Sequence, residues 1–189
     1  VYSTHKLIVP GMQALLQENS AINGFILPGH VSVITGLKEY EKINLPQAVC
    51  GFEPEHILRG IYALVKMINE GSKKLVNTYP EAVSSNGNKK AKELIDKHFF
   101  VDTSSWRGIG DIPSSGFEVK NDSLNPKKLY KELLQNVHSQ EHTSCKCGEV
   151  LMGLIRPTDC PLFAKTCTPG SPKGACMVSS EGACQIYYN

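Results

Sequence analysis

Residues 47–71 read QAVCGFEPEHILRGIYALVKMINEG, and this stretch predicts a buried strand that leads into a long helix. The first four residues form a short, mostly apolar run, and Pro54 after it suits the first turn of a helix. Apolar residues then recur at helical spacing, and Gly71 suits the helix C-terminus. The positions that we expect to form the apolar helix face are Ile57, Leu58, Ile61, Leu64, Val65 and Ile68.

Two more strand-to-helix steps precede this stretch. Residues 6–9 form a short apolar run before Pro10, and residues 24–27 form another before the turn at 28–32. Strands that alternate with helices predict a parallel α/β sheet. Because ligands gather at the carboxyl ends of parallel strands, the turns at 28–32 and 51–54 are the candidate cleft.

The downstream part of the chain has weaker periodic signals. Residues 89–98 predict a helix and residues 99–101 a strand. Asn125-Pro126 is expected to open an amphipathic helix that runs through Val137.

From residue 139 onward, cysteine and proline replace helical periodicity. We therefore predict an α/β protein in two parts. A Rossmann-like, parallel-sheet domain is expected over residues 1–118, and a small, loop-rich, cysteine-ligated cluster region over residues 119–189.

The composition argues against two classes of partner. Twenty Lys and Arg face eighteen Asp and Glu in 189 residues, and no basic run is long enough to follow a nucleic-acid backbone. No apolar stretch is long enough to span a bilayer, and the first residues lack a secretory pattern. We expect no nucleic-acid partner, no membrane association and a cytoplasmic location. The first residue is Val1, and we expect the sequence to be part of a longer chain.

Six of the seven cysteines gather between residues 145 and 184. Disulfides are disfavoured, because a chain without a secretory signal is expected in a reducing compartment and one cysteine is left over. Zinc fits poorly, because the only close pair has a Cys-x-Cys spacing that is shorter than the usual knuckle. The six residues are Cys145, Cys147, Cys160, Cys167, Cys176 and Cys184.

A [4Fe–4S] cluster fits the pattern best, because it accepts thiolates from well-separated loops, one to each iron. Gly148, Pro161 and Pro169 lie beside cysteines, where they can aim backbone N–H groups at sulfur. The spacing leaves open which four cysteines are ligands. The negative charge of such a site would favour nearby cations, and the candidates are Lys146, Arg156, Lys165 and Lys173.

Several motifs, taken in order, resemble one family. The cysteine-rich segment contains Cys147-Gly148-Glu149-Val150-Leu151, Cys160-Pro161-Leu162-Phe163, Cys167-Thr168-Pro169 and Met177-Val178-Ser179-Ser180-Glu181-Gly182-Ala183-Cys184. Upstream stand Pro28-Gly29-His30-Val31-Ser32 with Gly36, Gly51-Phe52-Glu53-Pro54 and Trp106-Arg107-Gly108-Ile109-Gly110. Together they resemble the C-terminal half of the HypD family of [NiFe] hydrogenase maturation proteins, over essentially the whole chain.

The resemblance implies a function, partners and a ligand set. HypD proteins act in the cytoplasm with HypC and HypE to build the Fe(CN)2CO unit that is inserted into [NiFe] hydrogenases. The cluster-binding cysteines of the family match Cys147, Cys160, Cys167 and Cys184. Cys145 lies outside that set, as does Cys176.

The sequence departs from the family in one large respect. The family's N-terminal half carries a Cys-Gly-x-His-x-His motif, expected to hold the iron that is being modified, and this chain has no counterpart to it. Cys50-Gly51 begins similarly, but Phe52-Glu53-Pro54 follows. We expect the iron to be held mainly by the half that is missing here, so this chain alone should not complete the reaction. Whether it is an enzyme or a scaffold with redox activity stays open.

Three residues of the candidate cleft are predicted to take part in the chemistry. His30 could relay protons or bind incoming iron or cyanide, although it could also only start the next helix. Ser32 is in the same turn, where a helix N-cap is the alternative. Glu53 could bond a substrate or partner, or only stabilise the positive end of the following helix.

Three other features have more than one interpretation. Cys50 ends an apolar run and is expected to pack as a small buried hydrophobe. Trp106-Arg107 predicts either a cover for the core or a surface anchor for another subunit. His138 and His142 have the spacing to share a metal on one helix face, but solvated histidines are the alternative in so polar a stretch.

Three functions therefore stay in competition. In the first, the chain is a cofactor-assembly protein whose cluster supplies or relays electrons. In the second, the cluster is purely structural and staples a loop-rich region that lacks a core of its own. In the third, zinc stabilises an interaction module.

Overall fold

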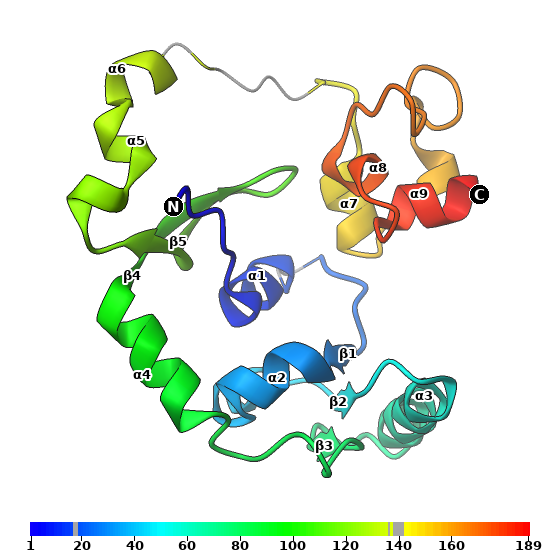
Figure 1. Ribbon diagram of the computed structural model, residues 1–189. Helices are drawn as coiled ribbons and strands as arrows, with labels where there is room; N and C mark the ends of the chain where they lie inside the picture. The colour runs from blue at the N-terminus through cyan, green and yellow to red at the C-terminus, as the bar shows by residue number, and fades with distance from the viewer. Residues whose placement is uncertain (17–18, 136, 138–141) are drawn as a thin grey trace. The chain divides into compact units, whose positions relative to one another are not determined.

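The computed structural model describes residues 1–16, 19–135, 137 and 142–189 (Figure 1). The chain forms two compact units. One unit is Ile22–Phe100, and the other joins Val1–Ala21 to Val101–Asn189. The predicted boundary at residue 118 stays a prediction about domains. Residues 1–21 and 101–118 belong to the same compact unit as the cysteine-rich segment. The first residues of the chain pair with the strands that precede the cysteine-rich segment.

A parallel three-stranded sheet is the centre of the Ile22–Phe100 unit. Its strands are β1 (Phe25–Pro28), β2 (Gln47–Cys50) and β3 (Leu75–Asn77), in the order β1-β2-β3. The central strand β2 is buried along its whole length. The mixed α/β class with a parallel sheet is therefore confirmed, as are the strands predicted at 24–27 and 47–50, whereas β3 was not predicted.

Helices follow β1 and β2. Pro28 leads into α2 (Gly29–Thr35), and a short 3-10 helix, η1 (Lys38–Lys42), continues toward β2. The Gln47 side chain donates to the carbonyls of Tyr40 and Ile43, at 3.0 and 3.1 Å, so this connection lies on one face of the sheet. Cys50 points to the opposite face, because successive side chains of a strand alternate.

The helix α3 (Pro54–Asn69) covers the face to which Cys50 points. Gly60 approaches so closely that a Cβ built on it would lie 3.2 Å from the Cys50 sulfur. The predicted helix and its glycine stop are confirmed, since Gly71 has a φ of 65°, the left-handed conformation that commonly ends a helix. The buried side of α3 is formed by Gly60 and Met67.

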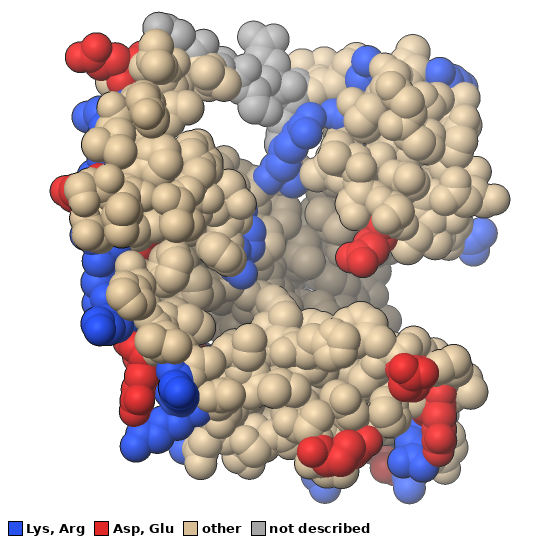
Figure 2. Space-filling model, in the orientation of Figure 1, with Lys and Arg blue, Asp and Glu red and all other residues tan. Residues whose placement is uncertain are grey.

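The apolar stripe predicted for α3 is mostly exposed. Only one side of α3 packs against the three-stranded sheet, so the side chains on the other side of the helix are exposed to solvent. On the face shown in Figure 2, acidic and basic side chains lie close together near this helix, and the ion pairs Glu55–Arg59 and Lys66–Glu70 belong to it. The exposed apolar residues, between 38% and 71% accessible, are Ile57, Leu58, Ile61, Tyr62, Val65 and Ile68.

The unit ends in α4 (Lys89–His98), the helix predicted at these residues. Asn88 caps it, because its side-chain oxygen accepts from the Ala91 N–H at 3.0 Å. The strand β4 (Phe99–Trp106) follows without a break and, with β5 (Gly110–Val119), forms a hairpin.

The N-terminal segment packs on this hairpin. The strand predicted at 6–9 is wrong, because only Lys6 forms a bridge, with Gly116, and α1 (Ile8–Leu15) begins two residues later. The fixed φ of Pro10 suits the first turn of that helix. The helix α1 lies against β5.

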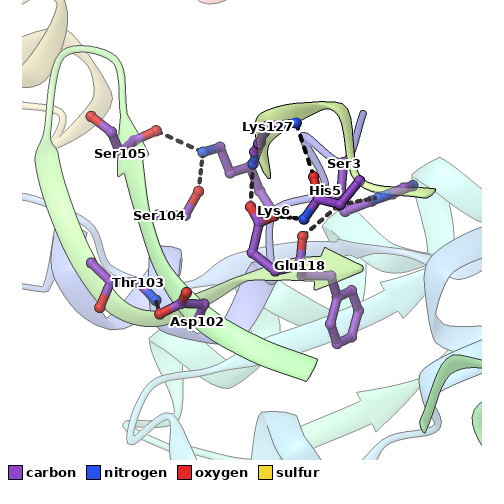
Figure 3. Close-up of polar contacts among 11 residues, drawn as sticks. Ser3, His5, Lys6, Asp102, Thr103, Ser104, Ser105, Glu118 and Lys127 are labelled. Carbon is purple, nitrogen blue, oxygen red and sulfur yellow. Dashed lines mark hydrogen bonds and ion pairs between the residues drawn. The ribbon is translucent and has the colours of Figure 1, made fainter. Parts of the chain in front are cut away.

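Polar contacts fix the N-terminal segment to the hairpin (Figure 3). The Lys6 ammonium donates to the Ser104 hydroxyl and, at 2.6 Å, to the Ser105 carbonyl. The fully buried Ser3 hydroxyl donates to the Phe117 carbonyl. These bonds join residues about a hundred positions apart and make the two segments one unit.

Short elements make up the rest of the chain. The predicted helix from Pro126 to Val137 is broken into α5 (Pro126–Leu129) and α6 (Lys131–Leu134), because Tyr130 leaves helical geometry with a ψ of 30°. A 3-10 helix, η2 (Asp122–Leu124), precedes them. The cysteine-rich segment holds α7 (Cys147–Leu151), η3 (Pro157–Asp159), α8 (Ala175–Val178) and α9 (Ala183–Tyr188).

Within the ranges that the structure describes, no helix combines the length and the apolar character needed to cross a membrane.

Candidate functional site

The cysteine-rich segment brings its thiols together from separate short elements. Cys147 opens α7, Cys160 follows η3, and Cys167 forms a bridge with Phe163. Cys176 lies in α8 and Cys184 in α9. The loop-rich character that was predicted is therefore present, and each cysteine is placed by a different local turn.

These five cysteines form the core of the segment. Each is between 3% and 9% exposed, and Val150, Leu162 and Met177 are the other buried members of the cluster. Cys145 packs against it and is partly buried. A core made largely of cysteine is unusual, because apolar side chains normally fill that role. All seven cysteines are free thiols.

Contacts among the thiols show how closely they converge. The sulfurs of Cys176 and Cys184 are 2.9 Å apart, and the Lys173 backbone N–H donates to the Cys167 sulfur at 3.3 Å. Burial raises the pKa of the Cys184 thiol, and the thiols of Cys147, Cys160 and Cys167 raise it further, while the contact with Cys176 acts in the opposite direction.

Cys145 has a similar electrostatic environment. Burial raises the pKa of its thiol, a backbone hydrogen bond at Cys147 lowers it, and Cys147, Cys160 and Cys167 raise it through their charge. The four cysteines predicted as ligands are therefore near neighbours in the structure. Cys176, which was predicted to lie outside the ligand set, is in the same core.

The thiols can be compared with what two kinds of metal site require. Among the described residues, no three His, Cys, Asp or Glu side chains are arranged to hold one metal ion. A [4Fe–4S] cluster makes a different demand, because each thiolate binds a different iron and the sulfurs surround a larger object. Buried thiols from separate loops, with a backbone N–H donating to one of them, are consistent with that demand.

The four cations predicted near the cluster are arranged differently. Lys146 pairs with Glu149 at 2.6 Å, and that bond raises the pKa of the lysine. Lys173 donates to the Ser171 hydroxyl at 3.0 Å. Lys165 and Arg156 are both exposed. Of the predicted histidine pair, His142 is exposed, and His138 lies outside the described residues.

The residues predicted for the cleft lie at the carboxyl ends of β1 and β2. His30, in the first turn of α2, is exposed, and its ring lies 4.4 Å from that of Phe52. Glu53 is the N-cap residue of α3, but its side chain accepts no capping hydrogen bond. The structure thus brings the Pro28 and Gly51 turns together through His30 and Phe52, at the sheet edge where ligands of parallel sheets bind.

Ser32 is placed differently from His30, because its side chain is fully buried. Its hydroxyl donates to the Pro28 carbonyl at 2.9 Å and lies 3.3 Å from the Tyr40 hydroxyl. Both partners are protein groups, because Pro28 is the N-cap residue of α2 and Tyr40 lies in η1. This arrangement favours a structural role for Ser32. Ser32 is not the N-cap residue that was considered as the alternative, because Pro28 takes that position and Ser32 bonds its carbonyl from within the helix.

A stability measurement separates the two roles of Ser32. We expect Ser32→Ala to lower the free energy of unfolding by about 1–2 kcal/mol, because it leaves buried polar groups without their partner. Thr35→Ala is the control, since Thr35 bonds the Val31 carbonyl in the same helix from an exposed position and should change stability by less than about 0.5 kcal/mol. Chemical denaturation measures both. Unchanged stability in Ser32→Ala would contradict the structural role.

The sequence did not predict a histidine beside this edge. His56 lies against Gly51, where a built Cβ would be 2.3 Å from its Nδ1. Its Nε2 is 3.2 Å from Glu81, and its ring is 4.8 Å from that of Tyr79. Its buried Nδ1 has no hydrogen-bond partner among the residues that the structure describes. Only the glycine at 51 hinted at a close approach, and nothing in the sequence indicated which side chain would fill it.

The cysteine core and the cleft belong to an α/β protein with a cysteine-rich C-terminal region. Comparison with known families agrees with this. The model of the HypD family, described as the hydrogenase formation hypA family, matches residues 1–189. The chain belongs to the HypD family.

Curated relatives are similar to essentially the whole of this chain. It is 36% identical to hydrogenase maturation factor HypD2 of Bradyrhizobium diazoefficiens, over all of this chain and 53% of that protein. It is 38% identical to a putative hydrogenase expression/formation protein of Methanocaldococcus jannaschii, over all of this chain and 54% of the relative. The HypD of Escherichia coli is 36% identical over 99% of this chain and 52% of its own length. The chain thus spans about half the length of these relatives.

Proposed function

We propose that this chain takes part in hydrogenase maturation, as a component that builds the Fe(CN)2CO unit, and that it carries a [4Fe–4S] cluster on Cys147, Cys160, Cys167 and Cys184. Membership of the HypD family and the names of the relatives support the maturation role. The observation that supports the cluster is the convergence of buried cysteine sulfurs from separate short elements into one core.

The residues of the site have distinct parts in this proposal. When bound, the cluster supplies one-electron chemistry. The four thiols must give up their protons to act as ligands, and the Lys173 N–H stabilises the negative charge that then develops on Cys167. At the cleft, the exposed His30 imidazole would act as a proton relay or as a ligand. Glu53, which follows Phe52 in the sequence, would offer a carboxylate from the N-cap of α3. To take part in the chemistry, the buried Ser32 hydroxyl would have to exchange its bond to the Pro28 carbonyl for one to a substrate.

The iron that receives cyanide and carbon monoxide is cargo of this reaction. We propose that the part of the family not represented in this chain holds it, since the sequence here has no Cys-Gly-x-His-x-His motif. HypC-like and HypE-like proteins are the partners that we propose, with the reaction taking place in the cytoplasm.

A structural metal site is the second candidate function. The observation that favours it is that the cysteines themselves are most of the segment's core, so a metal would stabilise the fold whether or not it changed oxidation state. A cluster or zinc could serve this role in an interaction module. A reversible one-electron reduction, detected by electron paramagnetic resonance, favours the redox role, and its absence favours the structural one.

Metal analysis tests the cluster directly. Protein purified without oxygen is expected to contain about four irons and four sulfides per chain and to absorb broadly near about 400 nm, because four thiolate ligands are the usual complement of such a cluster. Iron, acid-labile sulfide and zinc are measured in the same sample. One zinc per chain without sulfide would refute the proposal and support the zinc-stabilised module.

A further inference from the structure

The tip of the β4–β5 hairpin, residues 107–109, lies directly on the cysteine core. Gly108, with a φ of 85°, faces Gly148 in the first turn of α7. A Cβ built on Gly148 would lie 2.6 Å from the Gly108 carbonyl oxygen, and one built on Gly108 would lie 3.3 Å from the Cys147 sulfur. Glycine at both positions is what allows the hairpin backbone to reach the Cys147 thiol.

A second contact connects the same tip to another cysteine. The Arg107 guanidinium donates to the Lys173 carbonyl at 3.4 Å, and the Lys173 N–H donates to the Cys167 sulfur at 3.3 Å. The loop around Lys173 is therefore held by the hairpin on one side and by a thiol on the other. Moving Arg107 would free this loop. It would also free the Lys173 N–H, whose hydrogen bond the Cys167 sulfur accepts.

The hairpin is itself held firmly at its base. The Trp106 indole donates to the buried Ser115 hydroxyl at 2.8 Å, and a Cβ built on Gly11 of α1 would lie 2.5 Å from the Trp106 ring. The Lys6 ammonium donates to Ser104 and Ser105 (Figure 3). It also lies 5.8 Å from the centre of the Trp106 ring. A base fixed in this way can hold the tip in one position over the thiols.

From these contacts we infer that the hairpin tip is a cap that positions Cys147 and the Lys173 peptide and shields the thiol core from solvent. The sequence predicted Trp106-Arg107 either as a cover for the core or as a surface anchor for another subunit. In this cap, Trp106 fixes the base of the hairpin and Arg107 bonds the Lys173 loop. The inference rests on the proposed function only in taking the core to hold a cluster. The opening that the cap leaves is a cavity of about 50 Å³, large enough for a few waters, lined by Arg107, Gly108, Cys145, Cys147, Gly148, Lys173, Gly174 and Ala175.

Two glycine substitutions test the cap with matched chemistry. Gly148→Ala adds a methyl group against the Gly108 carbonyl and should lift the tip, whereas Gly170→Ala adds the same group where nothing lies within 4 Å. We expect Gly148→Ala to raise the rate at which iodoacetamide alkylates Cys147 by roughly fivefold and to shorten the half-life of the visible absorbance in air by a similar factor. Gly170→Ala should match the parent in both measurements.

Peptide mapping of the alkylated chain distinguishes the outcomes. Selective acceleration at Cys147, with Cys50 of the other unit unchanged, supports the cap. Equal rates in the two alanine variants, or equal acceleration at Cys50 and Cys147, would overturn it. If Gly148→Ala does not fold, Arg107→Ala decides, because this exposed residue can be truncated without a steric clash and should accelerate alkylation of Cys167 by roughly threefold. An unchanged rate there would also overturn the inference.

The alkylation measurement needs no cluster, so it separates this inference from the proposed function. A parent protein without iron or sulfide would refute the cluster, while selective protection of Cys147 would still support the cap. A parent protein with a cluster, but with identical decay in Gly148→Ala and Gly170→Ala, would refute the cap and leave the cluster in place.

Discussion

Replacing any one of Cys147, Cys160, Cys167 and Cys184 by alanine is expected to remove the cluster, with loss of nearly all iron, sulfide and visible absorbance. Each iron of a [4Fe–4S] cluster takes one thiolate, so a missing ligand leaves an iron without its protein bond. The parent and the four variants are compared after anaerobic purification, by iron and sulfide content per chain. Retention of full iron content in one of the four would remove that residue from the ligand set.

The controls for this prediction are Cys145→Ala and Cys176→Ala, which should retain the cluster. Cys176 makes the comparison sharp, because its sulfur touches that of Cys184 and it is as buried as the proposed ligands. Loss of iron in Cys176→Ala together with retention in Cys147→Ala would show that the ligands are Cys160, Cys167, Cys176 and Cys184. Cys50→Ala, in the other compact unit, should have no effect on iron content.

Replacing His30 by alanine in an otherwise intact protein is expected to abolish hydrogenase maturation while leaving the cluster in place. His30 is exposed at the carboxyl end of β1, where a proton relay or a ligand to incoming iron or cyanide would be reachable. It belongs to the Ile22–Phe100 unit, whereas all the proposed cluster ligands belong to the other one. Hydrogenase activity in cells that depend on the variant, and iron content of the purified variant, are the two measurements.

His98→Ala is the matched control for this prediction, since His98 is an exposed histidine at the end of α4 in the same unit. It should support maturation as the parent does. Full maturation by His30→Ala would return His30 to the role of a helix-starting residue. Loss of the cluster in His30→Ala would show that the two units depend on each other more than their separate packing indicates.

The parts of the fold that could be predicted from sequence are those with strong local periodicity. The strand β2 and the helix α3 follow directly from residues 47–71, and α4 follows from the spacing of apolar residues over 89–98. The run at residues 6–9 was misread as a strand, because an apolar run of four residues does not distinguish a strand from a helix start. Tyr130 gave no sign of breaking the helix after Pro126.

Partners in space were harder to predict than elements. The stripe on α3 indicated a helix correctly, yet it could not show that Gly60 and Met67 would take the buried side and leave Ile61 and Tyr62 in solvent. Similarly, Trp106 was recognisable as a motif, but its place against Gly11 depends on a contact between residues almost a hundred positions apart. Such contacts leave no periodic trace in a single sequence.

The sequence predicted which cysteines gather at the site, but it could not show which four of them are ligands. Six thiols in one segment indicated a metal site, and the structure gathers five of them in one core with Cys145 beside it. Burial does not separate ligands from neighbours, since Cys176 and Cys184 have the same exposed fraction, 6%. His56 was missed because its proximity to Gly51 and Glu81 comes from the turn geometry and not from a motif.

The division of the chain into units sets an order of events during synthesis. The Ile22–Phe100 unit is continuous, so it can fold as soon as it has left the ribosome, whereas Ser3 must wait for Phe117, which follows 114 residues later. The hairpin can therefore be anchored only after the middle unit has been made, and the thiols of the last elements meet later still. If the thiol core holds a cluster, iron and sulfide would enter a chain whose Ile22–Phe100 unit has already been made, so loading of the core would follow folding of that unit.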